Sequence, residues 1–157
     1  MLKITCAVLL SVSLQGFSQE SILKEFAEER NDFKLCLYPS TLRMINIKKD
    51  PEYNKLVSGI EKLLIYNLDS ATAATKDYKE WTYKYTLRGY EEYISMSGKM
   101  NLLILGKDDE FVGATGADGR MMAFYLRGTI AFQKIPKLLE TFEGGDMISL
   151  ITSQLDR

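Results

Sequence analysis

The chain has 157 residues, of which 46% are hydrophobic and 26% are charged. Its 20 Lys and Arg residues nearly balance its 21 Asp and Glu residues, so the composition indicates a folded globular protein without a nucleic-acid partner. The sequence contains no His, which excludes Ser-His-Asp and Cys-His catalytic pairs and the HExxH zinc site. No cofactor and no metal site are indicated by any motif.

Residues 1–18 have the order of a secretory signal peptide. Lys3 is followed by an apolar run and then by small residues, which predicts cleavage between Ser18 and Gln19. The run is shorter than the roughly 20 residues that a membrane-spanning helix needs, so no transmembrane segment is expected. Cys6 precedes most of this run, whereas a lipoprotein cysteine would follow it. We therefore expect an exported protein, either periplasmic or secreted.

Residues 19–157 are expected to form a single α+β domain. Cys36 is the only cysteine of this part, so no internal disulfide can form. Its apolar surroundings predict a small buried side chain, and the alternative is a reactive thiol.

The first half of this domain is predicted to alternate helices and strands. Apolar residues recur at helical spacing over residues 21–31, whereas residues 33–38 and 60–67 form short apolar runs typical of strands. Pro39 and the Asp50–Pro51 pair mark the starts of two short helices between these strands. The two strands could pair in parallel through a right-handed crossover and form a βαβ-like unit.

The second half is predicted to contain a long helix, a meander of four strands and a closing helix. The long helix covers residues 69–88 and ends at Gly89. Short apolar runs separated by turn sequences then predict an antiparallel meander. Residues 146–157 also show helical apolar spacing. The four strands cover residues 90–96, 100–105, 110–115 and 121–126, and the closing helix covers residues 132–142.

This order of elements predicts an α+β fold with a mostly antiparallel sheet. The C-terminal four-strand meander and the N-terminal βαβ-like part would make up the sheet. The helices are expected to pack on one face of it.

The serial order of several segments resembles domain-of-unknown-function family 4252. This family comprises small exported proteins found mainly in Bacteroidota. The resemblance covers roughly residues 19–142, and it implies an exported α+β domain with no assigned activity and no site residues to carry over. Some members look like lipoproteins, and this chain departs from them because it lacks a cysteine at the cleavage site. The segments are Gly89–Tyr93, Ser97–Ile104, Phe124–Ile130 and Ile135–Leu138.

Two groups of carboxylates are candidates for acid-base chemistry. Glu91 and Glu92 are adjacent in a predicted strand, so they should point to opposite faces of the sheet. Asp108, Asp109 and Glu110 lie in a predicted hairpin turn, where acidic residues are favoured by local geometry. We interpret both groups as solvated side chains rather than catalytic pairs.

An aromatic cluster is the other candidate site. Tyr78, Trp81 and Tyr85 follow one another at i, i+3 and i+7, so they share one helix face, which we interpret as a face packed on the sheet; the alternative is a platform for a ligand. Tyr83 lies off this stripe near Lys84, a composition typical of a contact surface. Tyr78, Trp81, Tyr83 and Tyr85 are therefore the candidate binding residues.

These observations favour a non-catalytic exported module that binds another envelope protein or associates with itself. The alternative is a carrier of a small apolar ligand or lipid, because helices over a curved sheet can enclose an apolar pocket. A third possibility is a hydrolase that uses Asp, Glu, Lys or Tyr, since acid-base chemistry does not require His.

Overall fold

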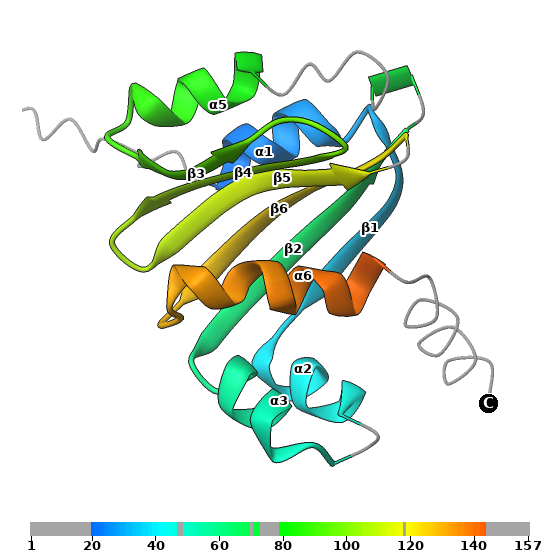
Figure 1. Cartoon of the computed structure of the whole chain (residues 1–157), viewed down its shortest axis with the longest axis vertical. Helices are drawn as coiled ribbons and strands as arrows, with labels where there is room; N and C mark the ends of the chain where they lie inside the picture. The colour runs from blue at the N-terminus through cyan, green and yellow to red at the C-terminus, as the bar shows by residue number, and fades with distance from the viewer. Residues whose placement is uncertain (1–19, 47–48, 70, 73–78, 118, 144–157) are drawn as a thin grey trace, which may run out of the picture.

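The computed structural model describes residues 20–46, 49–69, 71–72, 79–117 and 119–143, which are organised around one six-stranded sheet (Figure 1). All neighbouring strands are antiparallel, in the order β1-β2-β6-β5-β4-β3. The predicted four-strand meander is therefore confirmed. The strands are β1 (Asn31–Leu37), β2 (Ile60–Leu68), β3 (Glu91–Met96), β4 (Met100–Lys107), β5 (Glu110–Ala117) and β6 (Arg120–Gly128).

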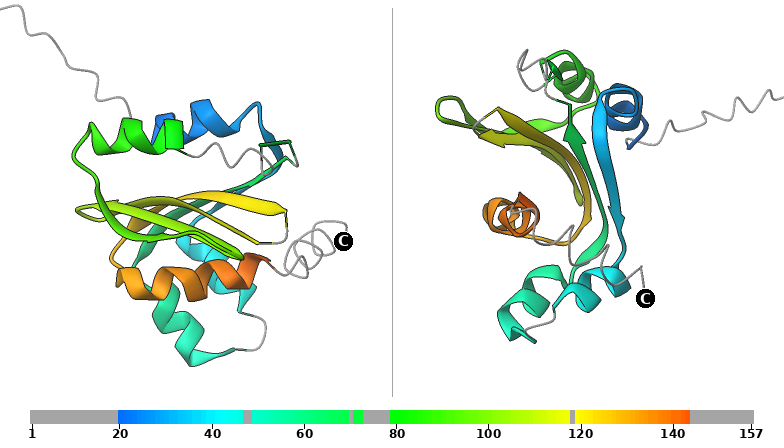
Figure 2. Two further views of the ribbon diagram at one scale, coloured as in Figure 1. Left: turned by 45° about the horizontal axis from the view of Figure 1, so that its top comes forward. Right: turned by 90° about the vertical axis from the view of Figure 1, so that its right-hand side faces the viewer.

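Helices cover both faces of this sheet, and the α+β fold class is confirmed. Figure 2 shows α1 and α5 on one face, α6 on the other, and α2 and α3 together at one end of the sheet. The helices are α1 (Glu20–Ala27), α2 (Pro39–Ile45), α3 (Pro51–Val57), α5 (Lys79–Thr86) and α6 (Ile135–Glu143), and a 3-10 turn (Phe132–Lys134) precedes α6.

The helices differ from the prediction in lying on two faces rather than one. In the central strands, buried residues follow one another without alternation, as at residues 63–66 of β2, 102–106 of β4 and 121–126 of β6. Neighbours in a strand point to opposite faces, so such runs present apolar side chains on both sides of the sheet. Both sides therefore require a helical cover.

The first two strands also differ from the prediction, because β1 pairs with β2 in the antiparallel sense, with Leu35 opposite Ile65. The expected βαβ-like unit is therefore absent from this part of the described chain. A parallel crossover must span the length of a strand, which is roughly 30 Å for the 9 residues of β2. The intervening helices have 7 residues each, or roughly 10 Å, so they form a connection at one end of the sheet.

Residues that were predicted to begin or end helices do so in the structure. The Asp50 side chain accepts a hydrogen bond from the Glu52 backbone N–H at 2.9 Å and caps α3. Gly89 follows α5 with φ of 83°, the left-handed conformation that glycine adopts readily at the end of a helix. Parts of the predicted helix over 69–88, namely residues 70 and 73–78, and the predicted helical segment 146–157 lie outside the described residues.

Cys36 is exposed, so the prediction of a buried cysteine is wrong. It lies in β1, which has a strand neighbour on one side only. Leu35 and Leu37 pack into the core on the α6 side, and the alternating residue Cys36 therefore points to the opposite side.

Candidate functional site

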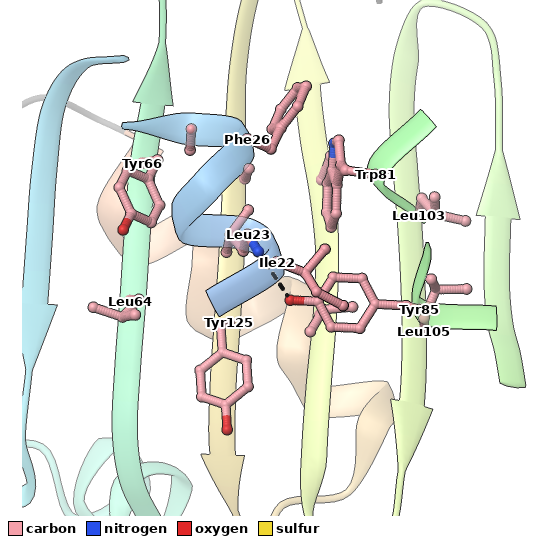
Figure 3. Packing of buried hydrophobic residues seen from close by; sticks show 14 of the residues in the cluster. Ile22, Leu23, Phe26, Leu64, Tyr66, Trp81, Tyr85, Leu103, Leu105 and Tyr125 are labelled. Carbon is pink, nitrogen blue, oxygen red and sulfur yellow. Dashed lines mark hydrogen bonds between the residues drawn. The ribbon is translucent and has the colours of Figure 1, made fainter. Parts of the chain in front are cut away.

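Two described members of the predicted aromatic stripe, Trp81 and Tyr85 of α5, lie in the core between α1 and the sheet. Trp81 and Tyr85 are 1% and 0% exposed and lie over Leu103 and Leu105 of β4 (Figure 3). Trp81 packs on Phe26 of α1 with 5.5 Å between ring centroids, and it meets Tyr85 edge to face at 5.8 Å. These contacts agree with the interpretation of the stripe as a packing face.

The Tyr85 hydroxyl also holds α1 in place. It accepts a hydrogen bond from the backbone N–H of Leu23 at 3.2 Å. Leu23 is the fourth residue of α1. The hydroxyl of an α5 side chain therefore contacts the backbone of α1 directly, and the two helices are linked as one layer.

The outer side of α5 carries the accessible member of the predicted site. Tyr83 is 63% exposed, and Leu87, four residues later, is exposed in the same direction. Lys84 forms a surface ion pair with Glu25 of α1 at 3.7 Å. Tyr78 lies outside the described residues. Of the four predicted binding residues, Tyr83 is therefore the one that the described structure leaves available to a partner.

A second accessible group lies on β3 and the hairpin that follows it. Among the described strands, β3 pairs with β4 only and forms one edge of the sheet. Met96 and Met100 are about half exposed, at 49% and 47%. Tyr93 is also exposed, and its ring packs against Phe132 with 5.2 Å between centroids. This edge strand therefore presents apolar side chains next to an unpaired backbone.

Together these residues form what we call the β3 edge surface: Tyr83, Leu87, Tyr93, Met96 and Met100. Among the described residues, seven large hydrophobic side chains are exposed, and five of them belong to this surface. The other two are Tyr38 and Met44. Figures 1 and 2 show α5 lying above β3 and β4, so the apolar side chains flank the edge strand from both faces of the sheet.

The candidate carboxylates are not brought together as a catalytic pair. Glu91 and Glu92 are exposed and lie opposite Gly106 and Leu105, successive residues of β4, so they point to opposite faces as expected. Asp108 and Asp109 are exposed in the turn between β4 and β5. Asp109 lies 3.9 Å from the Arg127 guanidinium, a surface ion pair.

Glu110 differs from these carboxylates, and its prediction as a solvated turn residue is wrong. It is the first residue of β5 and is partly buried. The hydroxyls of Tyr90 and Tyr125 both donate hydrogen bonds to its carboxylate, the latter at 2.8 Å. The three side chains come from separate segments that only the sheet register brings together. No local sequence signal could have identified this cluster.

Alkaline pH should unfold the protein through this cluster and Tyr85. Burial raises the pKa of Tyr85, Tyr90 and Tyr125, and for the last two the Glu110 carboxylate raises it further. Because the folded-state pKa exceeds the unfolded value near 10, these residues stabilise the fold below about pH 10 and lose that contribution as the pH rises. We expect a loss of about 1.4 kcal/mol per tyrosine and pH unit above 10.

Titration from pH 8 to 13, followed by circular dichroism and by tyrosinate absorbance, checks this expectation. The ionisation of these tyrosines should coincide with unfolding. Complete ionisation of all tyrosines in a chain that keeps its folded spectrum would contradict it.

Within residues 20–46, 49–69, 71–72, 79–117 and 119–143, no group of three or more Cys, Asp and Glu side chains is arranged to hold a metal ion. No helix of the same residues has both the length and the apolar character needed to cross a membrane.

The chain matches no known family model, no curated protein and no solved structure at a significant level.

Proposed function

We propose that this chain is an exported, non-catalytic module that binds protein through the β3 edge surface. The single observation that carries the proposal is the concentration of exposed large hydrophobic side chains around one edge strand, five of the seven in the part of the chain that the structure describes. The occupant is either another envelope protein or a second copy of the chain.

An edge strand suits this role because its outer N–H and C=O groups can pair with a strand of another protein. The exposed side chains of β3 and its hairpin are of types that are common in protein interfaces. Tyr and Met are enriched at protein interfaces, and the flexible Met side chain adapts to different partners. Tyr83 and Leu87 add apolar contacts on the α5 side, so a partner strand would be flanked on both faces.

The same edge carries features that limit indiscriminate pairing. The pairing of β3 with β4 is irregular between Glu92 and Ile94, which is typical of a β-bulge. Glu91 and Glu92 place two negative charges at the start of the strand. Bulges and charges are the usual protection of edge strands, so they favour a selective partner over general aggregation.

The described structure supports the binding module better than the two other possibilities. A carrier needs an open apolar pocket, whereas the layer between α1, α5 and the sheet is occupied by the rings of Phe26, Trp81, Tyr85 and Tyr90, which pack in tilted and edge-to-face pairs with 4.9 to 5.8 Å between centroids. A hydrolase needs converging acid and base groups, whereas the carboxylate of Glu110 is already bonded to two tyrosines.

Export and family membership are parts of the same proposal. The order of residues 1–18 supports export with cleavage before Gln19. The resemblance to domain-of-unknown-function family 4252 supports an envelope or extracellular location. Intact mass of the protein from its own cells tests export, because the exported chain should begin at Gln19.

Binding should depend on the β3 edge surface. We expect the triple variant Tyr83→Ser, Met96→Ser, Met100→Ser to weaken binding at least about tenfold, because central apolar contacts dominate interface affinity. Pull-down from the envelope fraction measures binding of another protein. Light scattering over a range of concentrations measures binding of a second copy.

Met44→Ser is the matched control, because Met44 is 79% exposed on α2 and lies outside the β3 edge surface. It should bind like the unaltered chain. Equal binding by the triple variant and the control would overturn the proposal, as would a chain that stays monomeric and retrieves no specific protein.

A further inference from the structure

The charges along the β3–β4 hairpin follow a pattern that is complementary to itself. The acidic residues Glu91 and Glu92 lie at the start of β3, and Lys99 lies beyond its end, in the turn to β4. All three are exposed. When such a strand pairs with a copy of itself in the antiparallel sense, the acidic start of each strand meets the basic end of the other.

Side-chain type supports the same pairing. Ile94 and Met96 lie opposite Ile104 and Leu102 of β4, so both point to the α6 face of the sheet, and Ser95 points to the other face. A two-fold axis at Ser95 places Ile94 opposite Met96 of the second copy, and by symmetry Met96 opposite Ile94 of the second copy. Cross-strand apolar pairs of this kind stabilise antiparallel sheets.

Other registers lose one of these features. A two-fold axis at Ile94 would place Glu92 opposite Met96 of the second copy and Lys99 opposite Gly89. An axis at Met96 would place Glu92 and Glu91 opposite Met100 and Asn101, past the turn. The axis at Ser95 pairs apolar with apolar residues, and it brings the acidic start of β3, which lies before the irregularity between Glu92 and Ile94, towards the turn that carries Lys99.

We propose that a second copy of this chain is an occupant of the β3 edge, with β3 pairing antiparallel to β3 about a two-fold axis at Ser95. The pairing joins two six-stranded sheets into one continuous sheet, with α6 of both copies on the same face. It rests on the proposed function, because it names the partner of the same surface. One short strand buries a small area, so the dimer should form in the micromolar range.

Disulfide trapping tests the register directly. In a Cys6→Ser, Cys36→Ser background, Ser95→Cys places two thiols opposite each other at the two-fold axis, within the Cα separation of about 4.5 to 5.5 Å that a disulfide can bridge. Ser97→Cys is the control, since its two copies would be roughly 13 Å apart. Mild oxidation of the full chain should give a linked dimer for Ser95→Cys at least about tenfold faster than for Ser97→Cys. Equal rates, or no dimer for either, would overturn the proposed pairing.

Charge reversal gives an independent test. Glu91→Lys or Lys99→Glu alone should weaken self-association about three- to tenfold, since each exposed pair contributes modestly and occurs twice in the dimer. The double reversal should restore it, as measured by light scattering. A double variant no better than the single variants would contradict the pairing.

The outcomes separate this inference from the proposed function. If the chain stays monomeric but the edge variants lose a specific envelope protein, the self-pairing is wrong and the binding function stands. If neither self-association nor a partner depends on the edge, both are overturned.

Discussion

Replacing Trp81 by alanine should lower the free energy of unfolding by about 3–5 kcal/mol, the usual loss when a buried large aromatic side chain is removed. Trp81 lies between Phe26 of α1 and the strands of the sheet, so its loss opens a cavity in the layer that joins α5 to the rest of the fold. Urea denaturation followed by circular dichroism measures the change.

Tyr83→Ala is the matched control on the same helix, two residues away. Tyr83 is exposed, so this variant should change the free energy of unfolding by no more than about 0.5 kcal/mol. Similar losses for the two variants would mean that α5 does not dock through the face described.

The second large effect is expected at Glu110. Its replacement by alanine removes the acceptor of two buried hydroxyls, on Tyr90 and Tyr125. Leaving a buried donor unsatisfied costs about 1–3 kcal/mol, so the loss of both acceptors should lower the free energy of unfolding by about 2–6 kcal/mol. Chemical denaturation at neutral pH measures it.

A mutant cycle separates the hydrogen bonds from other effects of the substitution. In a Tyr90→Phe, Tyr125→Phe background the donors are gone, so Glu110→Ala should cost less than half as much as in the unaltered chain. An unchanged cost in that background would show that the carboxylate stabilises the fold by another route.

The features of the fold that could be predicted are those that depend on local chemistry. Asp50 before Pro51 and Gly89 after α5 specify helix ends through their own backbone and side-chain preferences. The four strands of the meander are likewise marked by apolar runs and short turns. Each of these signals lies within a few residues of the feature that it determines.

The arrangement of the sheet could not be predicted because it depends on distant pairings. β2 lies beside β6, although about 50 residues separate them in the chain. That pairing makes β1 and β3 the two edges of the sheet. Exposure of Cys36 in β1 and of Met96 in β3 follows from the edge positions, and their neighbours in sequence do not reveal it.

Parts of the candidate site likewise follow from local chemistry, and other parts depend on distant pairings. Helical spacing placed Trp81 and Tyr85 on one face of α5 and Tyr83 off it, and the described structure has this separation. The contribution of β3 to the surface was missed, since an apolar residue in an edge strand has the same sequence appearance as one in a central strand. The Glu110 cluster was missed because the Tyr90, Glu110 and Tyr125 side chains meet only after the sheet has formed.

Protein binding at the β3 edge surface can be tested by site-specific photo-crosslinking in the native cells. A photoreactive amino acid replaces Met96 in one variant and Met44 in the other, two exposed methionines of which only Met96 belongs to the surface. We expect a discrete cross-linked product from position 96, either with one protein species or with a second copy, and none from position 44. Equal products at both positions, or none at position 96, would contradict protein binding at this surface.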